Sequence, residues 1–365
     1  MGDNRTKWLL ALGALVGLCV VSLLCVVAVG GYSIFTRASG GDTGGPVPDD
    51  DAVVEGGTGE TSGISKGTNE LVLLGADPPT LDPALASDAT SANYIVEIFS
   101  GLVGLDPELE IVPDIAESWE VGQDGTLYTF TLRADVVFAD GRPVTAEDFK
   151  YSMERACDPA TQSPVADTYL GDIVGCREKL RGSTSEVSGV RVVDPSTLEI
   201  QIDAPKVYFL AKLTYPTAFV VDRETIEREG RLWASSTPNG TGPFKLQEYT
   251  FAERLVLVPN ENYYGEPKPS LDEVTYILSG GSGMTMYETD EIDIVGVGLA
   301  DLDRVLDPSS PLNEDLREVE SFSIGYIGLN AQMPPFDDPL VRQAFNLAID
   351  KEALAEVVLE GTVTP

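Results

Sequence analysis

The chain from residue 69 onward is predicted to have an α/β fold in which strands and helices are mixed. Strand-type and helix-type segments follow one another there without the strict strand–helix–strand order of a parallel sheet. The chain of 365 residues is long enough for two or three domains, and its apolar content of 43% supports a large core. We therefore expect mixed α+β lobes, and the sequence contains no internal repeat.

The predicted strands are short apolar or alternating runs bounded by turn signals. They cover residues 69–75, 119–121, 127–133, 187–193, 198–203, 240–249, 253–259, 273–278, 291–297 and 322–330. The turns GQDGT and DPST each join two of these runs into a predicted hairpin. Within 127–133, Tyr128, Phe130 and Leu132 alternate onto one face, which we expect to be buried.

The predicted helices show apolar residues at helical spacing. They cover residues 91–102, 146–156, 299–306, 340–349 and 351–360. The second has the clearest start, because Thr145 and Asp148 have the spacing of a capping box. Asp140 belongs to a turn just before it. The acidic residues crowded into FADGRPVTAEDFKYSMER, 138–155, therefore have structural roles, and we expect scaffold there rather than an active site.

Residues 1–37 are predicted to form a membrane anchor. Arg5 and Lys7 precede an uncharged run, 8–35, whose 28 residues would make a helix about 42 Å long, enough to span a bilayer with tilt. The positive-inside rule puts the chain after Arg37 on the extracytoplasmic side. A cleaved signal peptide has a shorter apolar region, and cleavage just after the run is the alternative.

Residues 38–68 are predicted to be a linker. They are rich in Gly, Pro, Asp and Thr and contain few large apolar side chains, a composition typical of disorder. As a flexible coil, a segment of this length has a root-mean-square reach of roughly 30 Å. We therefore expect the folded part to be tethered close to the outer membrane face.

Charge and residue types limit the chemistry of the chain. It has 59 acidic and 24 basic residues, a net charge of −35. Such a surface repels nucleic acid and anionic lipid headgroups, and it keeps a secreted protein soluble. The chain has no histidine, which removes Ser-His-Asp and Cys-His catalysis and HExxH zinc sites. We expect no cofactor, no metal site and no nucleic-acid partner.

Cys157 and Cys176 are the two cysteines beyond the predicted anchor. An oxidising compartment favours a disulfide between them, with two free buried thiols as the alternative. In the chain-entropy account, closing a loop of this size stabilises the fold by about 3 kcal/mol.

Six stretches form an ordered set of motifs. They are DPPTLDP (77–83), IVPDIAESWEV with DGTLYTFTLRADVVFADGRPVTAEDFKYSMER (111–155), GTGPFKL (240–246), LVPNENYYGEPKPSLDEVTY (257–276), DEIDI (290–294) and LNAQMPPFDDPLVRQAFNLAIDKEAL (329–354). Together they resemble the extracellular solute-binding proteins of ABC importers, family 5, the oligopeptide- and dipeptide-binding type.

The resemblance implies a type II periplasmic-binding-protein fold, in which two lobes close on a ligand and an extra N-terminal subdomain is added. It places the first lobe at 69–118 and 195–322, and the extra subdomain at 119–194, held by the cysteine pair. Residues 325–365 begin the second lobe, which is incomplete in this sequence. The missing part includes the region where the family places the acidic residue that pairs with a peptide's α-amino group.

The resemblance also implies a set of ligand contacts. They are Asp77, Pro79, Thr80 and Leu81 in the cleft, Tyr169 from the extra subdomain, and Asn239, Thr241 and Gly242 at the cleft edge. Pro78 and Pro79 lack N–H donors, so carbonyl groups would carry more of any strand-like pairing with a peptide. An ordinary half-buried tyrosine at 169 and a plain turn at 239–242 are the alternatives.

The implied function is that of an extracytoplasmic binding protein, not an enzyme. It would capture oligopeptides or similar solutes by hinge closure and deliver them to permease and ATPase subunits. The ligand could equally be an oligosaccharide or another amphipathic solute. A membrane-tethered sensor is one alternative. A hydrolase using paired carboxylates is another alternative. Acidic pairs are abundant in the sequence, but none has a defined spacing that marks a catalytic pair.

Overall fold

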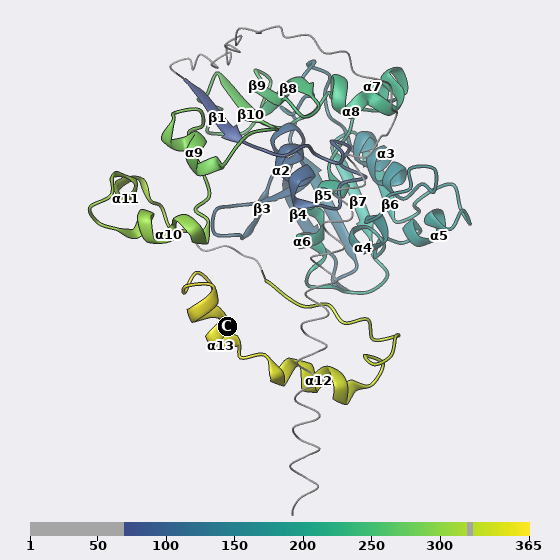
Figure 1. Cartoon of the computed structure of the whole chain (residues 1–365). Helices are drawn as coiled ribbons and strands as arrows, with labels where there is room; N and C mark the ends of the chain where they lie inside the picture. The colour runs from purple at the N-terminus through teal and green to yellow at the C-terminus, as the bar shows by residue number, and fades with distance from the viewer. Residues whose placement is uncertain (1–68, 320–323) are drawn as a thin grey trace, which may run out of the picture. The chain divides into compact units, whose positions relative to one another are not determined.

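The computed structural model describes residues 69–319 and 324–365 (Figure 1). The predicted anchor, 1–37, and the predicted linker, 38–68, lie outside the described residues. Within the two described ranges, no helix is both long enough and apolar enough to cross a membrane. Both four-stranded sheets lie within 69–319.

The first sheet, here called the mixed sheet, has the strand order β1-β10-β9-β8. Its strands are β1 (Glu70–Leu74), β10 (Glu273–Ile277), β9 (Arg254–Pro259) and β8 (Phe244–Thr250). β1 pairs with β10 in parallel, and β9 runs antiparallel to both β10 and β8. β1, β10 and β8 therefore point the same way, and their carboxyl ends meet at one edge, here called the carboxyl edge.

The strand predicted at 291–297 is wrong apart from one residue. Ile294 forms an isolated parallel bridge with Leu73. Next to it, the Asp293 side chain accepts the amide hydrogen of Val72 at 2.7 Å, while the Asp293 amide donates to the Val72 carbonyl at 2.8 Å. A side-chain oxygen thus accepts the hydrogen bond that a backbone carbonyl accepts in a regular β-ladder. The pairing with β1 therefore stays a single bridge.

The second sheet, here called the antiparallel sheet, has the order β4-β5-β7-β6. Its strands are β4 (Ala116–Val121), β5 (Leu127–Leu132), β7 (Thr197–Gln201) and β6 (Val190–Asp194). Both predicted hairpins are confirmed, since β4 pairs with β5 and β6 with β7. Tyr128, Phe130 and Leu132 on β5 are all buried, as their alternation predicted.

The remaining elements connect and cover these sheets. Between 69 and 319 they are the hairpin β2 (Val103–Leu105) and β3 (Ile111–Pro113), the helices α2 (Ala89–Ile98), α3 (Ala146–Ala156), α4 (Ala166–Tyr169), α5 (Cys176–Leu180), α6 (Phe209–Leu213), α7 (Arg223–Glu229), α8 (Trp233–Ser236), α9 (Gly283–Glu288), α10 (Leu299–Leu306) and α11 (Pro311–Asp315), and the 3₁₀ helices η1 (Pro216–Ala218) and η2 (Gly230–Leu232). The predicted helix at 299–306 is confirmed as α10.

The start of α3 confirms the predicted capping box. Asp148 accepts hydrogen bonds from the Thr145 amide at 2.8 Å and from its hydroxyl at 2.9 Å. The apolar face of the helix is fully buried, and it consists of Ala146, Phe149, Met153 and Ala156. Just past its end, Cys157 forms a disulfide with Cys176 at the start of α5, so the predicted pairing is confirmed.

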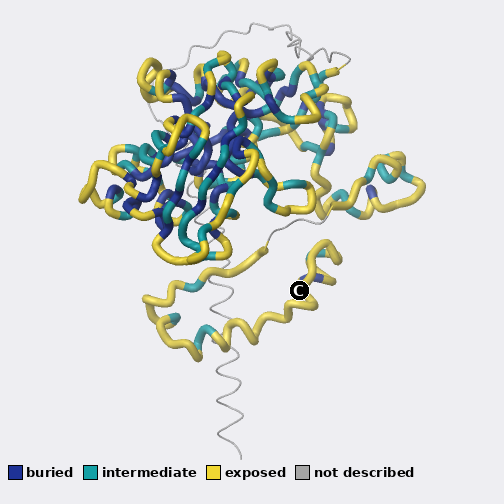
Figure 2. Tube along the Cα trace, turned by 180° about the vertical axis from the view of Figure 1, so that it is seen from behind, coloured by how far each residue is buried: buried dark blue, intermediate teal, exposed yellow. Residues whose placement is uncertain are grey.

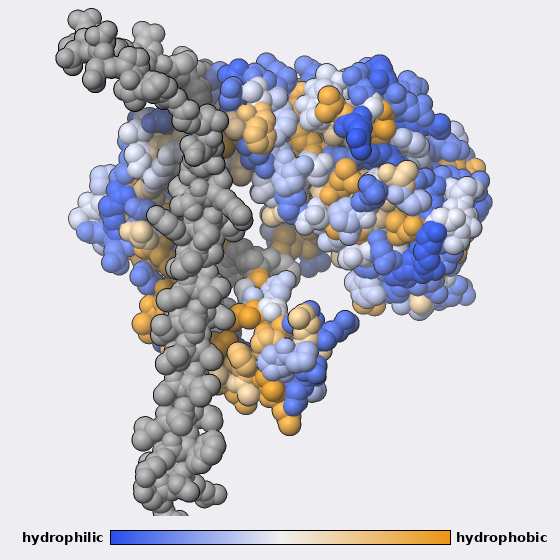
Figure 3. Space-filling view, turned by 45° about the vertical axis from the view of Figure 1, so that its right-hand side comes forward, coloured by the Kyte–Doolittle hydropathy of each residue, from blue (hydrophilic) through white to orange (hydrophobic). Residues whose placement is uncertain are grey.

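Each sheet has its own hydrophobic core, and Figure 2 shows the buried residues concentrated in the part of the chain that contains the two sheets. The antiparallel sheet packs with α3 and α6 around side chains such as Phe149 and Phe209. The mixed sheet packs with α2 and α8 around Phe99 and Trp233, whose rings meet edge to face at 5.8 Å. The face shown in Figure 3 is largely hydrophilic with separate apolar patches, in keeping with the acidic composition.

Residues 324–365 contain α12 (Pro339–Ala348) and α13 (Lys351–Ala353), which continues as a π-helical turn over Leu354–Val358. Both predicted helices are confirmed, and Asp350 caps the second by accepting from the Ala353 amide at 2.9 Å. The strand predicted at 322–330 is wrong over its described part, which forms neither helix nor strand. A strand needs a neighbour for its N–H and C=O groups, and no described strand pairs with 324–330.

Candidate ligand-binding edge

The carboxyl edge of the mixed sheet is the candidate site. In open α/β sheets, ligands bind in the crevice outside the carboxyl ends of the strands. Three segments leave this edge: 75–88 after β1, the β8–β9 hairpin at 250–254, and 278–283 after β10. The first of these contains four of the predicted ligand contacts.

Asp77 fixes the β8–β9 hairpin to the segment after β1. Its carboxylate accepts the Ala252 amide hydrogen at 3.0 and 3.2 Å, and the Tyr249 hydroxyl donates to it at 3.2 Å. Burial, together with this carboxylate, raises the pKa of Tyr249 to about 12. One residue earlier, the Tyr94 hydroxyl donates to the Ala76 carbonyl at 2.9 Å. The backbone at the start of the segment is thus held from two sides.

The next three predicted contacts differ in their exposure. Pro79 is exposed, so its ring faces solvent. Thr80 is half-buried, and its amide donates to the Ser91 hydroxyl at 3.3 Å. Leu81 is only 3% exposed and belongs to the core of the mixed sheet. The structure therefore leaves Pro79 as the open side chain of this group, with Asp77 and Thr80 engaged in bonds within the protein.

Tyr169 lies against Tyr215, which the sequence reasoning did not single out. The two rings are stacked with centroids 3.7 Å apart and an angle of 7° between their planes. The Tyr215 hydroxyl donates to the Ala86 carbonyl at 3.1 Å. Burial is the larger cause, and the nearby Tyr169 the smaller one, that raise the pKa of Tyr215 to about 12. The pair therefore links α4 to the segment after β1. No local sequence pattern marks Tyr215, because its partners are distant in the chain.

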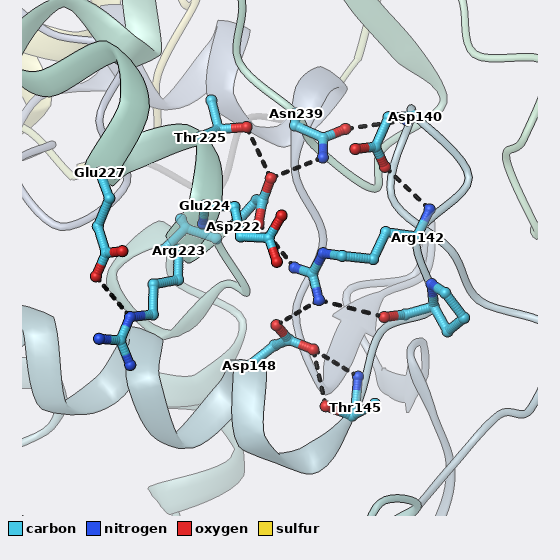
Figure 4. Close-up of polar contacts among 12 residues, drawn as sticks. Asp140, Arg142, Thr145, Asp148, Asp222, Arg223, Glu224, Thr225, Glu227 and Asn239 are labelled. Carbon is cyan, nitrogen blue, oxygen red and sulfur yellow. Dashed lines mark hydrogen bonds and ion pairs between the residues drawn. The ribbon is translucent and has the colours of Figure 1, made fainter.

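Asn239 takes part in a buried polar network rather than in the carboxyl edge. It is 7% exposed, and its side-chain oxygen accepts the Asp140 amide hydrogen at 3.0 Å. Its side-chain nitrogen donates to Asp222 at 2.9 Å (Figure 4). Both hydrogen-bonding ends of this amide are satisfied inside the protein.

Thr241 and Gly242 pack against the end of α2. The Thr241 hydroxyl, which is fully buried, accepts the Ser100 amide hydrogen at 3.0 Å. The Gly242 amide donates to the Ile98 carbonyl at 2.9 Å, and a Cβ at this glycine would lie 2.4 Å from the Glu97 carbonyl oxygen. These contacts also explain why the predicted helix 91–102 ends at Ile98, because residues 241 and 242 supply the partners that a further turn would use.

Arg142 is the centre of the network in Figure 4. Its guanidinium bridges Asp148 at the start of α3 and Asp222 at the start of α7, at 2.9 and 2.8 Å. Burial by itself would raise the pKa of Asp222, but hydrogen bonds from Asn239 and Thr225 and the charge of Arg142 outweigh it and lower that pKa. We call this network of Arg142, Asp148, Asp222, Thr225 and Asn239 the joint. It connects the antiparallel-sheet region to the mixed-sheet region.

Two surface pockets lie away from the segment after β1. One, of about 380 Å³, borders the joint near Asp140, Arg228 and Asn239. The other, of about 680 Å³, lies between α9 and α10–α11 and is lined by several acidic residues. Among the described residues, no group of three His, Cys, Asp or Glu side chains is arranged to hold a metal ion.

A family model described as "Bacterial extracellular solute-binding proteins, family 5 Middle" matches residues 110–365. The chain belongs to this family, and the predicted resemblance is confirmed.

Known relatives agree with this assignment. The chain is 33% identical over 291 residues to the periplasmic oligopeptide-binding protein OppA of Escherichia coli, covering 78% of this chain and 53% of the relative. It is 32% identical over 297 residues to the E. coli "Probable deoxycholate-binding periplasmic protein YgiS", covering 80% of this chain and 54% of that protein. The chain thus spans about half the length of the curated relatives it matches.

Solved structures confirm the fold. The E. coli murein tripeptide-binding protein MppA matches with a TM-score of 0.68 and 32% identity, covering 80% of this chain and 58% of that one. A periplasmic oligopeptide-binding protein of Borrelia burgdorferi, OppAIV, matches with a TM-score of 0.67 and 31% identity, covering 80% and 59%. The predicted type II periplasmic-binding-protein fold is therefore confirmed.

Proposed function

We propose that this protein is the solute-binding component of an ABC importer, and that it captures oligopeptides or similar solutes at the carboxyl edge of the mixed sheet. The observation that carries the proposal is the segment after β1, whose backbone is held by Asp77, Tyr94 and Tyr215 while Pro79 is left open to solvent. A pre-organised backbone suits strand-like pairing with an extended peptide, because less freedom is lost on binding.

In this proposal the predicted contacts divide into two kinds. Pro79, the carbonyl groups of 77–81 and Tyr169 touch the solute. The other predicted residues act through the backbone they hold in place, and they are Asp77, Thr80, Leu81, Asn239, Thr241 and Gly242. Their buried or bonded side chains support this division. No residue is assigned a chemical step, and the proposed role is binding without catalysis.

The proposed lobes follow the resemblance. The first lobe comprises 69–118 and 195–322, the extra subdomain 119–194, and the second lobe begins at 325–365. The distribution of strands supports this division, because β1 and β8–β10 fall in the first-lobe ranges. The antiparallel sheet spans residues 116 to 201, a few residues beyond the proposed subdomain at each end. Closure of the lobes about a hinge would then enclose the solute.

The proposal places the folded part outside the cytoplasm, tethered by residues 1–37 through the linker 38–68, with permease and ATPase subunits as partners. The net charge of −35 supports an exported location, and the names of the relatives include the word periplasmic. Protease treatment of intact spheroplasts tests this arrangement. We expect the folded part to be degraded from outside while a membrane-retained N-terminal fragment remains.

Binding by the full chain tests the central claim. Isothermal titration with trialanine, glutathione and deoxycholate should show saturable binding of at least one of them. Tyr169→Ala should weaken that binding about tenfold, since stacking and burial of one aromatic ring are worth roughly 1 to 2 kcal/mol. Tyr208→Ala, at a half-exposed tyrosine beside α6, is the matched control and should leave affinity unchanged. Absence of saturable binding for all three solutes contradicts the proposal.

A further inference from the structure

Phe251 stands out at the carboxyl edge as a large apolar side chain that is 74% exposed. It occupies the tip of the β8–β9 hairpin. Single apolar side chains on a protein surface are common and by themselves indicate nothing. The hairpin that carries Phe251 is unusual in how firmly it is held.

Both neighbouring segments of the edge hold this hairpin tip. Asp77, after β1, accepts the Ala252 amide hydrogen with both carboxylate oxygens. Leu278, after β10, donates its amide hydrogen to the Glu253 carbonyl at 2.9 Å. Ala252 has a φ of 56°, in the left-handed region that a residue with a Cβ adopts only when its surroundings impose it. The backbone that carries Phe251 is therefore fixed before any ligand arrives.

Other exposed apolar side chains lie along the same edge. Leu74 ends β1, and Ile294 is bridged to Leu73 beside it. Leu74 thus lies at the end of the strand that leads to Asp77, and Phe251 lies on the hairpin that Asp77 holds. An ordered backbone with an exposed apolar group near it is suited to a solute that combines hydrogen-bonding groups with an apolar one.

We propose that Phe251 is a specificity-determining residue of the ligand site, which contacts an apolar group of the bound solute, and that Asp77 is its positioning residue. This inference rests on the proposed function and narrows its substrate class to amphipathic solutes, such as peptides with an apolar side chain. A backbone that is fixed in advance loses little freedom on binding, so more of the apolar burial against the Phe251 ring appears as affinity.

The test compares two tripeptides, Ala-Phe-Ala and Ala-Ser-Ala, by titration of the full chain. Phe251→Ala should weaken Ala-Phe-Ala by about tenfold and change Ala-Ser-Ala by less than about twofold. Phe251→Leu should have an intermediate effect. Leu232→Ala is the matched control, because Leu232 is similarly exposed, at 68%, but lies beside α8. Asp77→Asn should reduce discrimination between the tripeptides in the same direction as Phe251→Ala.

The outcomes separate this inference from the proposed function. If the wild-type chain binds neither of these tripeptides, nor trialanine, glutathione or deoxycholate, the proposed function fails and the inference falls with it. If the wild-type chain binds but Phe251→Ala leaves the ratio of the two affinities unchanged, the inference is overturned and the proposed function stands. An equal loss for both tripeptides also overturns it, because that result marks a general disturbance of the edge.

Discussion

The joint and the carboxyl edge are both rich in polar contacts, but they use them differently. At the joint, buried side chains bond to one another, as Arg142 does with Asp148 and Asp222. At the edge, side chains bond to backbone groups, as Asp77 does with Ala252, and an apolar ring is left in solvent. Mutually satisfied buried groups stabilise a fold. A fixed backbone with open apolar groups is a binding surface.

The largest effect is expected from removing Asp222, which tests whether the joint stabilises the fold. Its side chain is almost fully buried and accepts bonds from Arg142, Asn239, Thr225 and the Glu224 amide. Asp222→Ala leaves these donors without their acceptor, so we expect a loss of about 3 to 5 kcal/mol in the free energy of unfolding. Urea unfolding followed by tryptophan fluorescence measures it.

A matched control for that variant is Asp135→Ala. Asp135 pairs with Arg133 at 3.0 Å, but its side chain is mostly exposed. We expect a change of less than about 1 kcal/mol, because exposed ion pairs contribute little. If the two variants lose similar stability, the joint is not the structural centre that its geometry indicates.

Removing Asp77 tests the other side of the comparison. Asp77→Ala deletes the acceptor of the Ala252 amide and the Tyr249 hydroxyl, so we expect a loss of about 1 to 2 kcal/mol in the free energy of unfolding. The variant should remain folded under assay conditions, so its lower stability does not account for a loss of ligand affinity. We nevertheless expect affinity to fall, because the hairpin that carries Phe251 is no longer held by Asp77. Titration of the folded variant measures that affinity.

Asp106→Ala provides the matched control at another hairpin. Asp106 accepts the amide hydrogens of Glu108 and Glu110 in the β2–β3 hairpin, at 3.0 and 2.8 Å. Its removal should cost a similar amount of stability and leave ligand affinity unchanged. Equal affinity losses in the two variants would mean that the edge has no special role in binding.

The sequence predicted those parts of the fold that depend on neighbouring residues. The capping box at Thr145 and the buried face of β5 are local patterns, and both are confirmed. The disulfide between Cys157 and Cys176 followed from the compartment and the small number of cysteines. The ordered family motifs predicted the overall fold and class, which the comparisons confirm.

What the sequence could not show depends on contacts between distant residues. Asp77 was predicted as a ligand contact, yet its partners on the β8–β9 hairpin are more than 170 positions away. Tyr215 was missed because only folding brings it to Tyr169 and Ala86. The residues at 291–297 are typical of a strand, but the Asp293 side chain accepts a hydrogen bond that a backbone carbonyl accepts in a regular strand pairing. The predicted ligand contacts themselves stay predictions.

The pH dependence of stability is the smallest of these effects, and it has opposite signs for two carboxylates, the buried Asp222 and the half-buried Asp114. The pKa of Asp222 is lowered, so its contribution is present above its unfolded value, near 3.8, and is lost as the pH falls through the folded value. Burial raises the pKa of Asp114 despite a hydrogen bond from Tyr264, so its contribution is present at low pH and is lost as the pH rises through its folded value. The two groups therefore act in opposite directions on either side of about pH 3.8: Asp222 gives stability that is lost as the pH falls below this value, and Asp114 gives stability that is lost as the pH rises above it.

Substitution by asparagine tests these signs, because it removes each titration while keeping the shape of the side chain. Asp222→Asn should flatten the loss of stability as the pH falls below about 4, whereas Asp114→Asn should remove the gain in stability that Asp114 gives as the pH falls toward about 4 from above. The measurement is the urea midpoint at a series of pH values, and only its slope with pH is compared, since each substitution also changes stability at neutral pH. Parallel slopes for wild type and Asp222→Asn would mean that Arg142, Asn239 and Thr225 do not hold this carboxylate ionised, and the joint would then lose its electrostatic basis.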